Sequence, residues 1–94
     1  MVKLVAVLKA KPGQEAAVTQ ALRDLAVPSK AEPGCVMYVP CRSKADPAKL
    51  VVIEEWADQA AFDAHAASPH FQAFLAKVGN ALAGEPELEF VEVL

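Results

Sequence analysis

The sequence predicts an α+β domain of the ferredoxin-like type, in which the elements follow the order βαββαβ and the strands form an antiparallel sheet. Apolar residues recur with strand spacing and with helix spacing in that order, and Pro or Gly stands at the junctions. The predicted helices cover one face of the sheet, whereas the strands carry apolar residues on both faces. With 94 residues, the chain is expected to form a single domain over residues 1–94.

The first strand and the first helix are predicted at the start of the chain. Residues 2–9 are rich in Val and Leu on both parities, so this strand is expected to be covered on both faces. After Pro12-Gly13, apolar residues at the spacing of one buried stripe indicate a helix: Val18, Ala21, Leu22 and Leu25. Pro28 is expected to kink or end this helix because it lacks an amide hydrogen, although one further turn over 29–31 is compatible with the sequence.

Two strands joined by a polar loop are predicted in the middle of the chain. After a turn at Glu32-Pro33-Gly34, strands are expected over Cys35 to Arg42 and over Leu50 to Trp56, antiparallel to each other. Simple alternation places four residues of the earlier strand on the face opposite Tyr38: Cys35, Met37, Val39 and Cys41. The two cysteines would then lie roughly 20 Å apart, too far for a disulfide, so both are expected to be reduced thiols.

Two helices and a strand are predicted for the rest of the chain. Asp58 is a good N-cap for a short helix that carries Phe62 and His65 on one side. Ser68-Pro69 combines a hydroxyl cap with Pro at the first helical position, which indicates the start of another helix. The apolar stripe of this helix continues far enough to predict a C-cap at Gly84: Phe71, Phe74, Leu75, Val78 and Leu82. A last strand is expected over Glu87 to Leu94, because Pro86 prevents continuation of the helix.

The composition limits the classes of partner. The net charge is -3 and there is no cluster of Lys and Arg, so binding to nucleic acid is not expected. No secretory signal and no apolar run of the roughly 18 residues needed to span a membrane is present, so a cytoplasmic location is expected. The hydrophobic fraction of 54% is high for so short a chain, and helices can cover only one face of the sheet. A second copy packed sheet against sheet would cover the other face, so the sequence predicts a homodimer.

Residues typical of a functional site are concentrated around the end of the third predicted strand and the helices after it. They include the only Trp, both His residues and two adjacent carboxylates: Glu54, Glu55, Trp56, Phe62, His65, His70 and Phe71. No phosphate-binding glycine loop occurs in the chain. Two interpretations of His65 remain open, a partly buried packing residue and a group that titrates near neutrality at the rim of a cavity.

A metal site is not expected from the spacing of the two histidines. His65 and His70 are five residues apart with Pro69 between them, so they do not share a helical face as an i, i+4 pair does. His70 falls in the first turn of its helix, where a positive charge is unfavourable, and it is expected to be neutral and structural.

The same residues resemble the signature of the antibiotic biosynthesis monooxygenase family. The resemblance rests on five motifs and covers essentially the whole chain: Ile53-Glu54-Glu55-Trp56, Phe62 with Ala64-His65, Ser68-Pro69-His70-Phe71, Glu32-Pro33-Gly34-Cys35 and Lys11-Pro12-Gly13. It implies a dimeric α+β barrel of two ferredoxin-like subunits, with a hydrophobic pocket between sheet and helices.

The chain is most similar to the quinol monooxygenases of this family, which oxidise hydroquinones with O2 and use no metal, flavin or other cofactor. The resemblance implies that His65 is the catalytic base or hydrogen-bond donor. Trp56, Phe62 and Phe71 would line the substrate pocket, and Glu54 or Glu55 would orient the reacting groups. A phenolic anion passes an electron to oxygen readily, so the protein need only bind, deprotonate and exclude water.

Other activities of related proteins provide alternatives. Haem degradation is disfavoured, because the aligned pocket positions are Ala6, His65 and Leu75 and an axial ligand is missing. An isomerase of a small phosphorylated dicarbonyl compound would need a cationic pocket, for which Lys9, Arg42 and Lys44 are the candidates. A dimer that binds a small ligand without catalysis is the remaining alternative.

Overall fold

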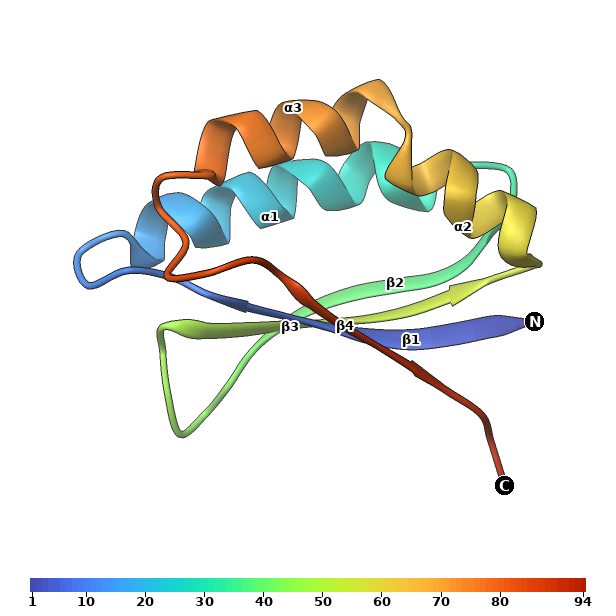
Figure 1. Ribbon diagram of the computed structural model, residues 1–94, viewed down its shortest axis with the longest axis horizontal. Helices are drawn as coiled ribbons and strands as arrows, with labels where there is room; N and C mark the ends of the chain where they lie inside the picture. The colour runs from blue at the N-terminus through green and yellow to red at the C-terminus, as the bar shows by residue number, and fades with distance from the viewer.

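The helices and the sheet form two layers in the computed structural model, which describes residues 1–94. All three helices lie on the same face of the sheet (Figure 1). The elements in chain order are β1 (Val2–Lys9), α1 (Glu15–Lys30), β2 (Cys35–Arg42), β3 (Lys49–Trp56), α2 (Gln59–Ala66), α3 (Pro69–Val78) and β4 (Glu87–Val91). The predicted ferredoxin-like α+β fold is therefore confirmed.

The sheet has the strand order β2-β3-β1-β4, and every neighbouring pair is antiparallel. Alternation in β1 and β3 determines which residues meet the helices. The residues of these two strands that are buried beneath the helices are Leu4, Ala6, Leu8, Leu50, Val52, Glu54 and Trp56. Apolar residues of α1 and α3 pack onto them to complete the core.

One prediction for β2 is wrong because the strand contains a bulge. The register shifts between Cys35, which pairs with Trp56, and Met37, which pairs with Glu55. The extra residue reverses the alternation, so Cys35 shares the inner face with Tyr38 and packs against the core. Both Cys35 and Cys41 are free thiols, as expected.

One helix end follows an alternative that the sequence left open, and another differs from prediction. Pro28 lies inside α1, and the helix continues to Lys30 before Ala31 N–H donates to the Pro28 carbonyl. Helix α3 ends at Val78 with Gly79 as its C-cap, not at Gly84. Leu82 belongs to the predicted apolar stripe but lies beyond the end of α3. It is buried because it forms an isolated β-bridge with Ala10.

Strand β4 ends at Val91 and does not extend to Leu94. Val91 pairs with Lys3, and β1 begins at Val2. Beyond Val91, almost no residues of β1 are left for β4 to pair with. None of the helices is both long and apolar enough to cross a membrane.

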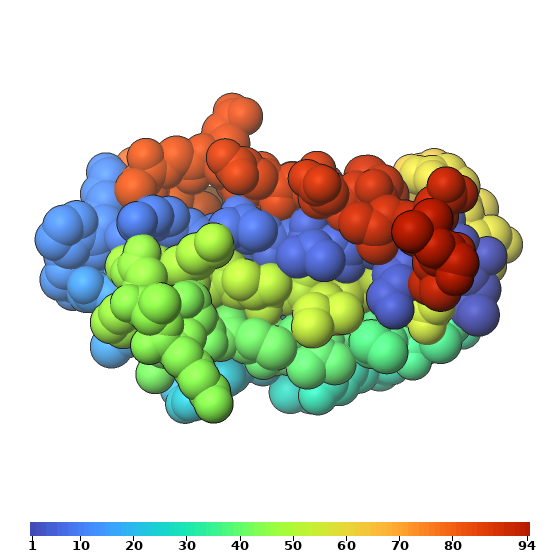
Figure 2. Space-filling model, turned by 90° about the horizontal axis from the view of Figure 1, so that it is seen from below, coloured from blue at the N-terminus to red at the C-terminus, as the bar shows by residue number.

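The sheet face opposite the helices is not covered by any other element of the chain. Figure 2 shows this face, on which the strands lie side by side with β4 along one edge. Alternation brings an apolar group to it from three strands: Val5, Val7, Val39, Val51 and Ile53. Val39 is 42% exposed, and the others are partly exposed.

Candidate functional site

A cavity of about 140 Å³ lies between the sheet and the helices. Its lining comes from all four strands and all three helices, and 11 of its 14 residues are hydrophobic. The titratable side chains in the lining are Tyr38, Glu54 and His65, and no Lys or Arg is among them. An apolar cavity of about 150 Å³ accommodates a benzene ring, so this one is of the size that holds one aromatic ring.

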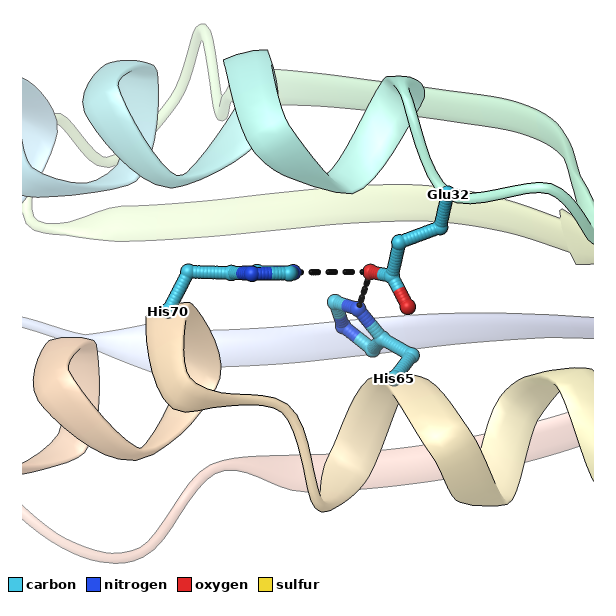
Figure 3. Close-up of side chains that lie close together, drawn as sticks. All are labelled: Glu32, His65 and His70. Carbon is cyan, nitrogen blue, oxygen red and sulfur yellow. Dashed lines mark hydrogen bonds and ion pairs between the residues drawn. The ribbon is translucent and has the colours of Figure 1, made fainter.

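His65 lies in the last turn of α2 and is 2% exposed. Its Nδ1 is 2.7 Å from Oε2 of Glu32, in the loop between α1 and β2. Nε2 of His70, in the first turn of α3, is 2.9 Å from the same oxygen (Figure 3). A carboxylate only accepts hydrogen bonds, so both imidazoles donate to Glu32. Neutral His65 then carries its proton on Nδ1, and Nε2 keeps a lone pair with no protein partner.

Burial lowers the pKa of His65, and the hydrogen bond and charge of Glu32 oppose this only in part. The imidazole is therefore neutral near pH 7. Aromatic rings hold it in place: its ring centroid is 4.6 Å from that of Trp56, 5.2 Å from Phe71 and 5.5 Å from Tyr38. The geometry gives a fixed, uncharged base at the wall of an apolar cavity.

The junction between α2 and α3 brings the two histidines to one carboxylate. The Ser68 hydroxyl donates to the His65 carbonyl at 2.6 Å and accepts from the Phe71 amide at 3.2 Å. With Pro69 at the first helical position, this cap ends one helix and begins the next in a new direction. His70 therefore returns toward His65, although the two residues belong to different helices.

Gly34 allows the Glu32 loop to approach α2 closely. A Cβ on Gly34 would overlap the Cβ of Ala61, so any other residue would push the loop away from the helix. The Gly34 carbonyl also accepts from the Ala57 amide at 2.8 Å. The contacts of Gly34 with Ala61 and Ala57 thus hold the loop that carries Glu32 against α2.

Glu54 is the second polar group of the cavity. It is 4% exposed, and its Oε1 accepts from the indole N–H of Trp56 at 3.0 Å. Burial raises the pKa of Glu54 to about 7, the indole hydrogen bond acts in the opposite direction, and the charge of Glu32 raises it further. Burial also raises the pKa of Tyr38, so its hydroxyl stays protonated. The residues that line the cavity thus include one base, one carboxyl group that titrates near neutrality and one phenol.

The structure distributes the predicted site residues over three locations. His65, Glu54, Phe62 and Phe71 line the cavity. Trp56 is fully buried behind them and supports His65 and Glu54. Glu55 pairs with Lys3 on the opposite face of the sheet, so it lies outside the cavity, because neighbouring strand residues point to opposite faces.

Sequence reasoning missed the role of Glu32. The prediction gave the orienting carboxylate as Glu54 or Glu55, whereas the residue that bonds His65 is Glu32, 33 positions earlier. As the spacing predicts, His65 and His70 do not share a helical face, because they belong to α2 and α3. The fold nevertheless brings the ligand atoms of Glu32, His65 and His70 within 4.8 Å of one another. The available signal is the Glu32-Pro33-Gly34 motif, which belongs to the family resemblance, but neither the turn nor the resemblance assigns a role to the Glu32 carboxylate.

Known proteins resemble this chain in sequence. YcnE of Bacillus subtilis, named "Putative monooxygenase", is 33% identical over 86 residues, which cover 92% of this chain and 90% of that protein. An uncharacterized protein of Synechocystis is 27% identical over 86 residues, and the chain spans 58% of that protein's length.

Solved structures show the same fold. PA3566 from Pseudomonas aeruginosa superposes with a TM-score of 0.93 at 31% identity, over 99% of this chain and 93% of that one. Rv0793 from Mycobacterium tuberculosis superposes with a TM-score of 0.91 at 28% identity, over 99% and 94% of the two chains. The sequence model described as antibiotic biosynthesis monooxygenase matches residues 1–77. The chain therefore belongs to the antibiotic biosynthesis monooxygenase family.

Proposed function

We propose that this protein is a monooxygenase or quinol oxidase that acts on a small aromatic hydroxyl compound with O2 and needs no further cofactor. The observation that carries the proposal is the neutral imidazole of His65, which is anchored through Nδ1 at the wall of an apolar cavity the size of one aromatic ring. The family supports oxygenase chemistry. The hydroquinone substrate class is part of the proposal and does not follow from family membership.

In the proposed reaction, Nε2 of His65 accepts a phenolic proton. General base catalysis of this kind contributes about 10²–10⁴-fold to a rate. The resulting phenolate passes an electron to O2, and the apolar walls exclude water from the intermediates. Glu54 and the Tyr38 hydroxyl would hydrogen-bond the ring oxygens and select the orientation of the ring.

The reaction balances without an external reductant. A hydroquinone and O2 give a hydroxyquinone and water when one oxygen atom enters a ring C–H bond. The substrate then supplies all four electrons, two from the C–H bond and two from conversion of the hydroquinone to the quinone. If no oxygen atom is inserted, the products are the quinone and hydrogen peroxide, and two electrons are transferred.

No observation favours an isomerase of a phosphorylated compound. Neither Lys nor Arg lines the cavity. Lys9 forms an ion pair with Asp46 at 2.9 Å, and Arg42 donates to Thr19 at 3.3 Å. The other alternative, a protein that binds a small ligand without catalysis, is decided by the oxygen-uptake experiment below.

We also propose that the protein is a homodimer. The uncovered sheet face carries apolar groups from three strands, and a second copy placed sheet against sheet would cover them. The family membership is consistent with this arrangement.

The test is oxygen uptake by purified protein with methylhydroquinone, a single-ring substrate, and with menadiol, a two-ring substrate. Wild-type protein should exceed the rate of autoxidation, and His65→Ala should lower the protein-dependent rate about 100-fold or more. Glu55→Gln is the matched control, because Glu55 lies outside the cavity, and it should keep the wild-type rate. Equal rates with and without protein would contradict the proposal, and ring binding without turnover would identify a binding module.

A further inference from the structure

We propose that Glu32, His65 and His70 form a binding site for a divalent transition-metal ion, such as Zn²⁺ or Co²⁺. Oε2 of Glu32 lies 2.7 Å from Nδ1 of His65 and 2.9 Å from Nε2 of His70, and the three atoms lie within 4.8 Å of one another (Figure 3). Three protein ligands with the remaining positions open is the arrangement of many catalytic and exchangeable metal sites.

The spacing suits such an ion after small side-chain movements. Metal–nitrogen and metal–oxygen bonds of roughly 2.1 Å in a tetrahedral site place neighbouring ligand atoms about 3.4 Å apart. To reach this geometry, the two contacts of Glu32 must lengthen by less than about 1 Å, and the two histidine nitrogens, which lie within 4.8 Å of each other, must approach by up to about 1.4 Å. Rotation of the glutamate and histidine side chains supplies such changes. Two imidazoles and one carboxylate are intermediate in softness and select Zn²⁺, Co²⁺, Ni²⁺ or Fe²⁺ over Mg²⁺ and Ca²⁺.

The three ligands are held in place before any ion arrives. They come from the α1–β2 loop, the end of α2 and the start of α3, which the Gly34 contact and the Ser68 cap fix relative to one another. The exposed fraction of the side chains rises from 3% for His65 through 14% for Glu32 to 25% for His70. An ion can therefore enter from the His70 side and keep water in its open positions.

Metal binding would change which nitrogen of His65 carries the proton. Without metal, Nδ1–H donates to Glu32 and Nε2 is the free base. An ion on Nδ1 displaces that proton, and neutral His65 must then carry it on Nε2. The metal-bound protein could no longer accept a phenolic proton at Nε2, so the metal would inhibit. This consequence rests on the proposed function, whereas the metal site itself does not.

The binding test uses full-length, chelator-treated protein and no substrate. Titration with CoCl2, followed by visible absorption, and calorimetry with ZnCl2 should give one ion per chain. Glu32→Gln and His70→Gln should each weaken binding at least about tenfold. The exposed, remote Glu85→Gln is the matched control and should bind as the wild type does. Circular dichroism of each variant separates loss of a ligand from loss of the fold.

Imidazole ¹⁵N NMR supplies a second readout. Zn²⁺ should move the proton of His65 from Nδ1 to Nε2 and shift Nε2 of His70. Unchanged affinity in both ligand variants, a thiolate–cobalt charge-transfer band from the cysteines, or unchanged histidine resonances would overturn the site. Oxygen uptake with and without Zn²⁺ then tests inhibition separately: a protein without oxidase activity contradicts the proposed function but leaves the binding result intact.

Discussion

Both faces of the sheet carry apolar side chains, but only one of them is covered by other elements of the chain. The inner face, which includes Glu54, is buried under three helices and holds the cavity. The outer face, which includes Glu55 and Ile53, has no cover within the chain. A one-residue step along β3 therefore moves a carboxylate from the site to the opposite surface. The proposed chemistry uses the inner face, and the proposed dimer uses the outer face.

The largest effect is expected from Trp56→Ala on the inner face. Trp56 is fully buried, packs against His65 and donates to Glu54, so its removal leaves a cavity and an unpaired buried acceptor. The free energy of unfolding should fall by about 3–5 kcal/mol. Val39→Ala on the outer face removes a partly exposed side chain and should cost about 1 kcal/mol.

Urea unfolding followed by far-ultraviolet circular dichroism measures both variants, because Trp56 is the only Trp and its fluorescence is lost. Trp56→Phe keeps most of the ring and provides a measurable variant if Trp56→Ala does not fold. Equal losses in the free energy of unfolding for Trp56→Phe and Val39→Ala would contradict the larger contribution of the inner face to stability.

The next effect concerns the outer face. Ile53→Glu places a charge in the apolar group that a second copy is proposed to cover, at a cost of about 3 kcal/mol or more. The dimer dissociation constant should therefore rise more than about 100-fold, while the monomer keeps its fold. Sedimentation velocity at micromolar concentration distinguishes the two states. Glu55→Gln on the same face should remain dimeric, and a monomeric wild-type protein would contradict the proposed assembly.

Local patterns predicted the sheet and most of the helices because burial follows the alternation of residues in β1 and β3. Leu50, Val52, Glu54 and Trp56 share one face in the sequence pattern and in the structure. The bulge near Cys35 was not predictable, since it depends on the partner strand. The early end of α3 also depends on a tertiary contact, the bridge between Ala10 and Leu82.

The sequence brought together candidate residues that are near neighbours in the chain, but it did not bring in a distant one. His65, Phe62 and Phe71 are close in sequence and line the same cavity. Glu32 reaches His65 only through the packing of the α1–β2 loop on α2, which no periodicity records. The tautomer assigned to His65 therefore depends on a contact that only the structure shows.

A pH-dependent effect is expected from the buried carboxyl group of the inner face. The pKa of Glu54 is raised from 4.5 to about 7, so the folded state holds a proton that the unfolded state releases between these values. The contribution of Glu54 to stability is complete below about pH 4.5 and is lost as the pH rises to about 7, by roughly 3 kcal/mol at most.

Glu54→Gln should remove this slope, which unfolding experiments at pH 5 and pH 8 would show. The lowered pKa of His65 acts in the opposite direction, since stability from a neutral buried imidazole grows as the pH rises. The difference between wild type and Glu54→Gln isolates the carboxyl group from this contribution. Glu55→Gln on the outer face is the matched control and should keep the wild-type slope.

The smallest effect on stability is expected from replacing the helix N-caps Ser68 and Asp58. Comparison of the two variants tests whether the junction between α2 and α3 positions the site. Ser68 and Asp58 are both N-caps, of α3 and α2, and each accepts one backbone amide. Replacement of either by Ala should cost about 1 kcal/mol. Only Ser68 also bonds the His65 carbonyl and sets the direction in which His70 leaves.

Ser68→Ala should therefore lower oxygen uptake and alter the ¹⁵N resonances of His65 and His70, whereas Asp58→Ala should lower the melting temperature alone. Thermal unfolding, oxygen uptake and NMR on the two variants provide the measurement. If both variants lose stability equally and neither changes the histidine resonances, the sheet and the Glu32 loop hold the site without help from the junction. A change confined to Ser68→Ala would show that the inner-face chemistry depends on how α2 turns into α3.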